Sequence, residues 1–448
     1  VTYEDAVVST QAMRASVQAT AGVASVRGVT PNTDLVTPTQ DVEGVMERLR
    51  GDPRVRRVER DVPAYVTNFH PNEPKLRYHW HLFATGAMHA YTSDAYPDGE
   101  GVTVAVLDTE FDLDHPDLEG VFLPGIDTCG THASSDCVPD TNPGLQHTTQ
   151  HFHATHVTGI IAAQPNNGQH AIGIAPNVDI LPVKVMSDGT GGGYTSSIIQ
   201  GLRWAAGLPV PGLETNPNPA DVINLSLSAG SGNQTLEDTL TEIHDLGITL
   251  VAAAGNADED YLWQPAAHPD VIAVAATGTN DNFNNNHDTE RATFSNTSDR
   301  QLYGSGTVDI AAPGDYIYSL VIDRSASASG TSMSAPQVAA AAALIHQENP
   351  TYTPTQIEAT LKDHTYYDAS HMRPNTHGAG VLRIDGLLGL PYPKTPDDTT
   401  ADITQHHNGE TRTTKIDLLF GWAVVYTPAL DPNRPMHHII EWEGTTYE

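Results

Sequence analysis

The sequence predicts an α/β fold, in which a mostly parallel sheet is covered by helices on both faces, preceded by a small α+β domain. Apolar runs without polar alternation recur between residues 102 and 276, and strands buried on both faces of a parallel sheet have this composition. Segments of helical periodicity separate these runs, as in a covered sheet. Residues 1–68 instead show the order β-α-β-β-α-β, which is the split βαβ pattern of ferredoxin-like domains.

The N-terminal domain is expected to contain short strands and two helices. Its second helix is the best defined, because apolar residues recur at i, i+3, i+4 and i+7 and Asp41 can cap the helix. No catalytic constellation appears in this domain. The expected elements are a strand at Asp5–Thr10, a helix around Met13–Ala21, a β-like stretch at Val23–Thr39, a helix at Val42–Leu49 and a strand at Val55–Val62.

The second domain supplies the predicted parallel sheet. Ligands of open α/β sheets bind outside the carboxyl ends of the strands. Asp108 directly follows one of the apolar runs and Asn256 follows another, so we expect both at this edge. The runs are Val102–Leu107, Val178–Val185, Asp221–Leu227, Ile248–Ala254 and Val271–Ala276, with helical patterns at Ser196–Ala206 and Leu236–Leu246.

The C-terminal residues differ in composition from the rest. A Pro- and Asp-rich stretch at residues 391–405 predicts a linker. Two strand-like segments, residues 415–426 and 437–444, follow it and predict a small β-rich extension. We therefore expect three domains, at residues 1–68, 69–391 and 392–448.

The composition is strongly acidic. Asp and Glu number 55 against 22 Lys and Arg, giving a formal net charge of −33, which argues against nucleic acid and anionic membranes as partners. A solvated surface that maintains solubility and an adaptation to high salt both remain open. The sequence lacks an 18-residue apolar run and an N-terminal signal segment. We favour a secreted protein whose sequence here begins after signal removal.

Two cysteines, Cys129 and Cys137, lie eight residues apart in a polar stretch. In a secreted protein such a pair is expected to form a disulfide that closes its own loop. Two separate surface thiols are the alternative.

Three motifs carry residues suited to nucleophilic catalysis. Asp108 lies in VAVLDTEFDLDHPDL, His153 lies in HATHVTG just before an expected helix at Thr155–Ala163, and Ser332 lies in GTSMSAP at the start of an Ala-rich helix that runs to about Gln347. A serine hydroxyl needs a base to take its proton during attack, and histidine does this near neutral pH. A carboxylate holds the imidazole in the correct tautomer.

These motifs and their order resemble the subtilases over about residues 70–390. The resemblance implies a secreted serine endopeptidase that acts through an acyl-enzyme, with Asp108, His153 and Ser332 as its triad. Ala252–Asn256 resembles the family segment whose Asn donates to the oxyanion, and removing that Asn costs roughly 10²–10³ in rate in subtilisin itself. Residues 1–68 resemble the family's inhibitory propeptide, with VERD for VEPD, which implies a zymogen.

Two positions depart from the family pattern. Glu110 and Ala154 stand where the resembled motifs carry glycine. Alanine suits most backbones that do not need a positive φ. The Glu110 carboxylate is expected either to raise the pKa of the imidazole, to crowd the site, or to point into solvent.

Three other readings compete with an active subtilase. One is a catalytically impaired binding protein with the same fold, which the intact set of four catalytic residues argues against. Another is a zinc hydrolase using His151, His153 and His156, for which no convincing further ligand motif is present. A sedolisin-like acid peptidase would carry a carboxylate in place of His153.

The resemblance also implies a substrate site and a metal site. Two segments would hold a polypeptide substrate as an added strand, and Trp263 would stand where a glycine usually forms the base of the specificity pocket, making it shallow. Asp117, Asn166 and Asn167 would bind a structural calcium ion, with a polar turn as the alternative. We expect a monomer whose partners are its substrates and its own propeptide. The expected backbone-binding residues are Gly191, Gly192, Gly193, Ser226, Leu227 and Ser228.

Overall fold

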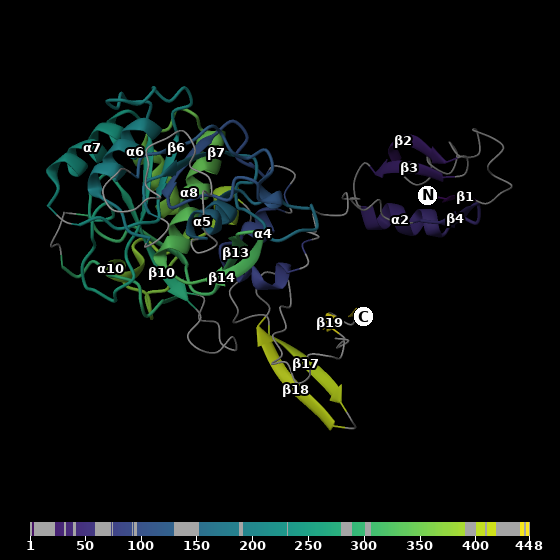
Figure 1. The fold of residues 1–448 in the computed structure, drawn as a ribbon. Coiled ribbons are helices and arrows are strands. Elements are labelled where there is room, and N and C mark those ends of the chain that lie inside the picture. The colour runs from purple at the N-terminus through teal and green to yellow at the C-terminus, as the bar shows by residue number, and fades with distance from the viewer. Residues whose placement is uncertain are drawn as a thin grey trace. The chain divides into compact units, whose positions relative to one another are not determined.

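A computed structural model gives the fold of the chain as two compact units, Val1–Asn68 and Phe69–Glu448. Figure 1 shows the fold of each unit. The structure describes residues 2–3, 23–30, 33–38, 42–58, 73, 75–91, 93, 96–129, 152–187, 191–230, 232–278, 289–300, 306–389, 400–407, 410–417, 440–442 and 445–447.

The first unit contains an antiparallel sheet of order β2-β3-β1-β4 and the helix α2. The expected second helix is confirmed, since Val45, Met46 and Leu49 are buried on one face of α2. The expected first strand and first helix lie outside the described residues. The elements are β1 Thr2–Tyr3, β2 Val23–Thr30, β3 Thr33–Pro38, α2 Val42–Arg50 and β4 Val55–Arg57.

The second unit is built on the predicted sheet, with strand order β15-β16-β12-β10-β9-β8-β5-β7-β6 and β11 beside β10. Every pair from β12 to β6 is parallel, whereas β15 and β11 pair antiparallel. The strands are β5 Thr103–Asp108, β6 Ile126–Asp127, β7 Asp179–Lys184, β8 Val222–Leu225, β9 Thr249–Ala253, β10 Ile272–Gly278, β11 Glu290–Arg291, β12 Ile310–Pro313, β15 Thr365–Tyr366 and β16 Val381–Leu382.

Helices cover both faces of this sheet, as predicted. Side chains alternate along β5, so that Val104 and Val106 belong to one apolar cluster while Ala105 and Leu107 belong to the other. The first cluster includes the helices α5, α8 and α9, and the second includes α6 and α7. The helices are α5 His153–Ala162, α6 Thr195–Ala205, α7 Gln234–Asp245, α8 Thr331–Glu348 and α9 Pro354–Asp363.

Shorter elements complete the second unit. The prediction of a linker is wrong for residues 400–405, because these residues belong to a strand that pairs with a second strand along its whole length. The short elements are α3 Trp80–Ala84, α4 Ala87–Ala90, α10 Pro374–His377, α11 Ile384–Leu387, the 3₁₀ turns Leu76–Tyr78 and Pro116–Leu118, and the hairpins β13 Ile317–Val321 with β14 Arg324–Ala328, β17 Thr400–His407 with β18 Glu410–Asp417, and β19 Ile440–Trp442 with β20 Thr445–Tyr447.

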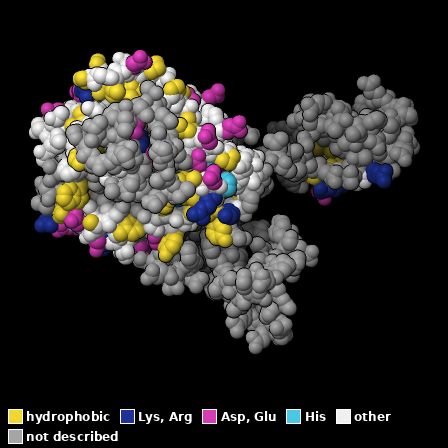
Figure 2. Space-filling model, viewed as in Figure 1, with side chains coloured by type: hydrophobic (Ala, Val, Ile, Leu, Met, Phe, Trp, Pro, Cys, Tyr) yellow, Lys and Arg dark blue, Asp and Glu magenta, His cyan; other side chains and the backbone are white. Residues whose placement is uncertain are grey.

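Two further sequence predictions bear on the surface and the loops. Cys129 is disulfide-bonded, and its expected partner, Cys137, lies outside the described residues. Figure 2 shows acidic side chains scattered over the visible surface rather than gathered into one patch. None of the helices in the described part of the chain has the length and apolarity needed to cross a bilayer.

Candidate active site

Asp108 ends β5 at the carboxyl edge of the sheet, where the sequence placed it. Its side chain is 2% exposed. The backbone N–H of Thr109 donates to Asp108 Oδ1 (2.7 Å), and the Thr109 hydroxyl donates to the same oxygen (3.2 Å). These donors fix the orientation of the carboxylate.

His153 faces this carboxylate from α5. Its Nδ1 lies 2.7 Å from Oδ1 and 2.9 Å from Oδ2 of Asp108. Burial acts to lower the pKa of His153, but the charge of Asp108 and its hydrogen bond outweigh burial, so the pKa is raised above its ordinary value. The helix begins at His153 itself, two residues before the predicted start.

Ser332 is the second residue of α8, as predicted for a serine at a helix N-terminus. Its hydroxyl donates to the carbonyl of Ser226 (3.2 Å), and the Ser226 hydroxyl donates back to the carbonyl of Ser332 (2.9 Å). The structure records no hydrogen bond between Ser332 and His153, although both residues are described. The Ser332 hydroxyl is therefore held against Ser226, the residue after β8, and the α8 dipole favours negative charge near it.

Asn256 is exposed at the end of the segment that follows β9. Its Oδ1 accepts hydrogen bonds from the backbone N–H of Thr331 (2.8 Å) and from the Thr331 hydroxyl (2.9 Å). Gly255, with φ of 111°, makes the turn before it, and a Cβ there would lie 2.5 Å from Asn296 Nδ2. Because Oδ1 is anchored beside Ser332, the Nδ2 group remains available as a donor.

The two positions that depart from the family motifs are both accommodated inside the protein. Glu110 is 2% exposed, and its Oε1 accepts a hydrogen bond from Lys184 Nζ (3.3 Å). The expectation that Glu110 points into solvent is wrong, because this buried ammonium draws it inward. Ala154 is fully buried, and neither residue has a positive φ.

The glycine segment beside the site is shaped by its own backbone contacts. Ser187 N–H donates to the Gly192 carbonyl (2.8 Å), and Gly191 N–H donates to the Ser187 carbonyl (2.9 Å). A Cβ on Gly193 would lie 2.8 Å from the backbone carbonyl oxygen of Val185 and 2.4 Å from Met186 Sδ. Glycine is therefore required at 193 by the protein's own packing, while residues 188–190 lie outside the described residues.

The second expected substrate segment, residues 226–230, lies beside the loop that carries Trp263. Ala229 N–H donates to the Gln264 carbonyl (2.6 Å). Trp263 is partly buried, its indole N–H donates to Glu259 Oε2 (2.6 Å), and its ring centroid lies 5.7 Å from that of Tyr261. The structure thus brings Trp263 next to residues 226–230 and holds the ring through Glu259 and Tyr261.

The expected calcium residues meet around a fully buried carboxylate. Asp117 Oδ1 accepts from Asn167 Nδ2 (2.5 Å), and Oδ2 accepts from the backbone N–H of Ala171 (2.8 Å). Asn166 has φ of 62° and forms the turn of the same loop. The two asparagines and Asp117 are brought together, with the Asn167 amide acting as a donor.

Glu73 belongs to the same group and was missed by the sequence reasoning. It is 4% exposed, and both of its carboxylate oxygens lack a hydrogen-bond partner. The pKa of Glu73 is raised, chiefly by burial, and the charge of Asp117 raises it further. An orphaned carboxylate beside Asp117 fits a cation site. The one sequence feature that could have pointed to Glu73 is an acidic residue between two prolines.

The structure does not assemble the zinc set. His153 Nδ1 is committed to Asp108, whereas His156 Nε2 bonds the carbonyl of Ala326 (3.2 Å), and His151 lies outside the described residues. No cluster of three or more His, Cys, Asp or Glu side chains that could hold a metal occurs within the described residues.

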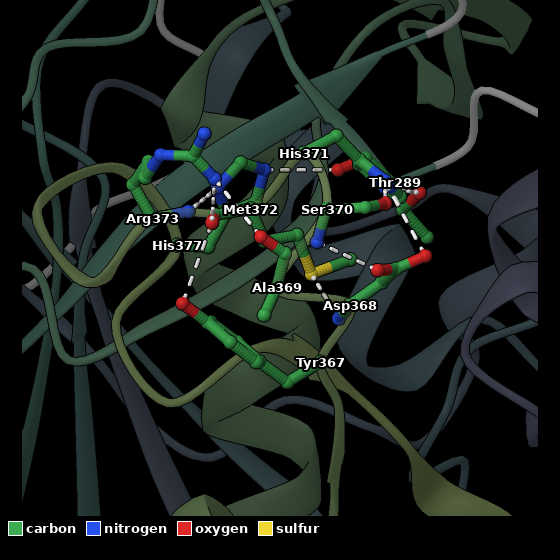
Figure 3. Close-up of polar contacts among 9 residues, drawn as sticks. All are labelled: Thr289, Tyr367, Asp368, Ala369, Ser370, His371, Met372, Arg373 and His377. Atoms are coloured by element: carbon green, nitrogen blue, oxygen red, sulfur yellow. Dashed lines mark hydrogen bonds and ion pairs between the residues drawn. The ribbon is translucent and has the colours of Figure 1, made fainter.

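A second Asp–His–hydroxyl arrangement is formed by other residues (Figure 3). His371 Nε2 is 2.9 Å from Thr289 Oγ1, and its Nδ1 is 3.5 Å from Asp368 Oδ2. His377 Nε2 donates to the Thr289 carbonyl (2.9 Å), and Arg373 bonds the carbonyls of its own loop. The His371 and Asp368 side chains are 37% and 38% exposed, so we assign this cluster to anchoring the loop 367–377 on residue 289.

Comparison with known proteins relates this chain to one family. A sequence model of the subtilase family matches residues 99–389. The chain is 33% identical over 359 residues to an extracellular basic protease of Dichelobacter nodosus, covering 72% of this chain and 56% of that protein. It is 34% identical over 345 residues to an alkaline protease of Alkalihalobacillus alcalophilus, covering 76% of each.

A solved structure shares the architecture. A protease from Pseudoalteromonas arctica has a TM-score of 0.60 and 31% sequence identity, covering 71% of this chain and 98% of that chain. The predicted subtilisin-like sheet with helices on both faces is thereby confirmed. Because the family match covers most of the chain and the relatives are peptidases by name, this chain belongs to the subtilase family of serine peptidases.

Proposed function

We propose that this chain hydrolyses peptide bonds through Asp108, His153 and Ser332, with Asn256 as an oxyanion donor. The contact of His153 Nδ1 with both oxygens of Asp108, at 2.7 and 2.9 Å, carries the proposal. It fixes the tautomer in which Nδ1 holds the proton and Nε2 is the acceptor. The carboxylate also stabilises the imidazolium that forms during attack.

The reaction follows from these positions. Ser332 Oγ leaves the Ser226 carbonyl and attacks the substrate carbonyl carbon, while His153 Nε2 takes its proton. The oxyanion accepts hydrogen bonds from Asn256 Nδ2 and from the N–H of Ser332, which lies in the first turn of α8 where backbone N–H groups have no helical acceptor. His153 then protonates the leaving amine, and water releases the acyl group by the reverse route.

The direct test is Ser332→Ala. We expect casein hydrolysis to disappear while the circular dichroism spectrum is retained. Ser327→Ala is the matched control, because Ser327 is an exposed hydroxyl on β14. Equal hydrolysis by Ser332→Ala and the parent protein would contradict the proposal, and an inactive parent protein would favour the impaired binding protein.

We further propose a structural calcium ion held by Glu73, Asp117, Asn166 and Asn167. Bound calcium would offset the repulsion between the buried carboxylates and stabilise the loop at residues 164–171. After chelation, millimolar calcium should raise the melting temperature, and Glu73→Gln should lose most of this rise. An equal rise in Glu73→Gln and the parent protein would place the ion elsewhere.

Residues 1–68 are proposed as an intramolecular chaperone and inhibitor, and the whole chain as a secreted zymogen. A separate compact unit before the peptidase unit supports this, because a parallel sheet folds slowly and gains from a template. Residues 70–448 alone should fold poorly, and added residues 1–68 should restore folding and inhibit hydrolysis. Full unaided activity of residues 70–448, without inhibition by added residues 1–68, would contradict this role.

A further inference from the structure

A buried ion cluster lies at the carboxyl end of the three strands β5, β7 and β6. Lys184, the last residue of β7, is fully buried. Its Nζ lies 3.3 Å from Glu110 Oε1 and 3.3 Å from Asp127 Oδ2, and both carboxylates are nearly fully buried. A buried ammonium persists only with partners of this kind, so the three side chains form one unit.

This cluster is joined to the catalytic carboxylate through the backbone. Lys184 is the in-register neighbour of Asp108 across the β5–β7 pair. The carbonyl of Asp108 accepts hydrogen bonds from Val185 N–H (2.9 Å) and Met186 N–H (3.1 Å), the two residues after Lys184. Backbone hydrogen bonds from the residues after β7 therefore hold the end of β5.

The turn after Asp108 is held by the same lysine. Thr109 donates two hydrogen bonds to Asp108 Oδ1, and Glu110, the next residue, reaches Lys184 Nζ. The turn also contacts the start of α5, because Ala154 N–H donates to Thr109 Oγ1 (3.4 Å) and Asp112 N–H donates to Thr155 Oγ1 (3.0 Å). Movement of this turn would shift both Asp108 and the helix that carries His153.

We propose that Glu110 and Lys184 are positioning residues for the hydrolytic reaction, holding the turn after β5 so that Asp108 meets His153 Nδ1. The inference rests on the proposed triad and deepens it. A glycine at position 110, as in the resembled motif, has no side chain to reach Lys184. This chain therefore secures its catalytic carboxylate through an ion pair that a glycine cannot form.

Glu110→Gln is the informative variant, because it leaves Lys184 paired with Asp127, whereas removing Lys184 would take the buried ammonium away from two carboxylates at once. We expect kcat to fall about tenfold with KM nearly unchanged, since small misplacements of catalytic groups cost this much or more. The acid limb of kcat/KM should also move to lower pH. Asp108 on β5 keeps the pKa of His153 raised, and among the described residues His156 on α5 also interacts with it.

Asp385→Asn is the matched control, because Asp385 forms a buried ion pair with Arg383 in another part of the unit. It should lower the melting temperature and leave the acid limb in place. Glu110→Gly is a second test variant, which does not introduce a buried amide. It should shift the acid limb of kcat/KM in the same direction as Glu110→Gln. The inference would be overturned if both Glu110 variants had the same kcat and the same acid limb as the parent protein. If Ser332→Ala hydrolysed peptides as fast as the parent protein, the proposed function would be overturned instead.

Discussion

Two groups of histidines in the second unit lie in opposite environments. We call the group of Asp108, His153, Asn256 and Ser332 the rim. There, the His153 side chain is 33% exposed and its Nδ1 contacts the Asp108 carboxylate. In the interior cluster of His79, His81 and His156, every side chain is fully buried. His153 and His156 belong to one motif and one helix turn. Their difference shows that the partner, rather than the residue type, decides which imidazole can act as a base.

The pKa values express this difference. Burial lowers the pKa of His156 to about 3 and that of His79 to about 4, and burial also lowers the pKa of His81. At the rim, Asp108 outweighs burial and raises the pKa of His153. A base must exchange protons near the working pH, and of these four histidines His153 is the one whose pKa burial does not bring below its ordinary value.

The largest expected effect separates the two histidines of α5. His153→Ala should lower kcat roughly 10⁴-fold or more, because the general base is lost. His156→Gln can keep a hydrogen bond to the Ala326 carbonyl and should retain kcat within about threefold. Steady-state kinetics on one peptide substrate measures both. An equal loss of kcat in the two variants would contradict the claim that His153, and not His156, acts as the base.

The next effect concerns the donor at the rim. Asn256→Ala should lower kcat by roughly 10²–10³ with little change in KM, the range known for the matching residue of subtilisin itself. Thr331→Val removes the hydroxyl that anchors Asn256 Oδ1 and should cost about tenfold. If Asn256→Ala raises KM at unchanged kcat, Asn256 binds the ground state and is not an oxyanion donor.

Acid should act on the interior cluster. Each of its histidines has a folded-state pKa below the unfolded value of about 6.5, so the unfolded state binds more protons as the pH falls. Their contribution to stability is complete above pH 6.5 and is lost as the pH falls toward 4, at about 1.4 kcal/mol per pH unit for each histidine.

Urea unfolding at several pH values measures this slope. His79→Gln should make the free energy of unfolding depend less steeply on pH between 6.5 and 4, whatever its effect at pH 8. An unchanged slope in this variant would show that His79 does not contribute to acid lability.

Much of the fold and of the rim could be predicted from the sequence, because the information is local. The strand before Asp108 and the helix after Ser332 are continuous patterns, and each motif lies beside its own element. Glu73 and the Glu110–Lys184 pair could not be predicted, because 44 and 74 residues separate Glu73 from Asp117 and Glu110 from Lys184. Such pairs depend on strand order, which periodicity does not encode. The first part of β17, residues 400–405, was taken for a linker because nearby Pro and Asp residues dominate the composition.

The smallest expected effect lies at the edge of the rim. Trp263 stands beside residues 226–230, and we expect it to limit the size of the residue bound before the cut. Trp263→Ala should raise kcat/KM for Phe or Leu over Ala at that position about tenfold. Glu259→Gln, which weakens the indole hydrogen bond, is the control for ring placement. A parent enzyme that already strongly prefers Phe or Leu would contradict the shallow pocket.

The most direct test of the central claim is to label the protein with a serine-reactive phosphonyl fluoride and to locate the adduct by peptide mass. A rim in which Asp108 and His153 activate Ser332 predicts a single adduct on Ser332, lost in His153→Ala and retained in His156→Gln. An unlabelled Ser332 in the parent protein, or equal labelling of His153→Ala, would contradict the account.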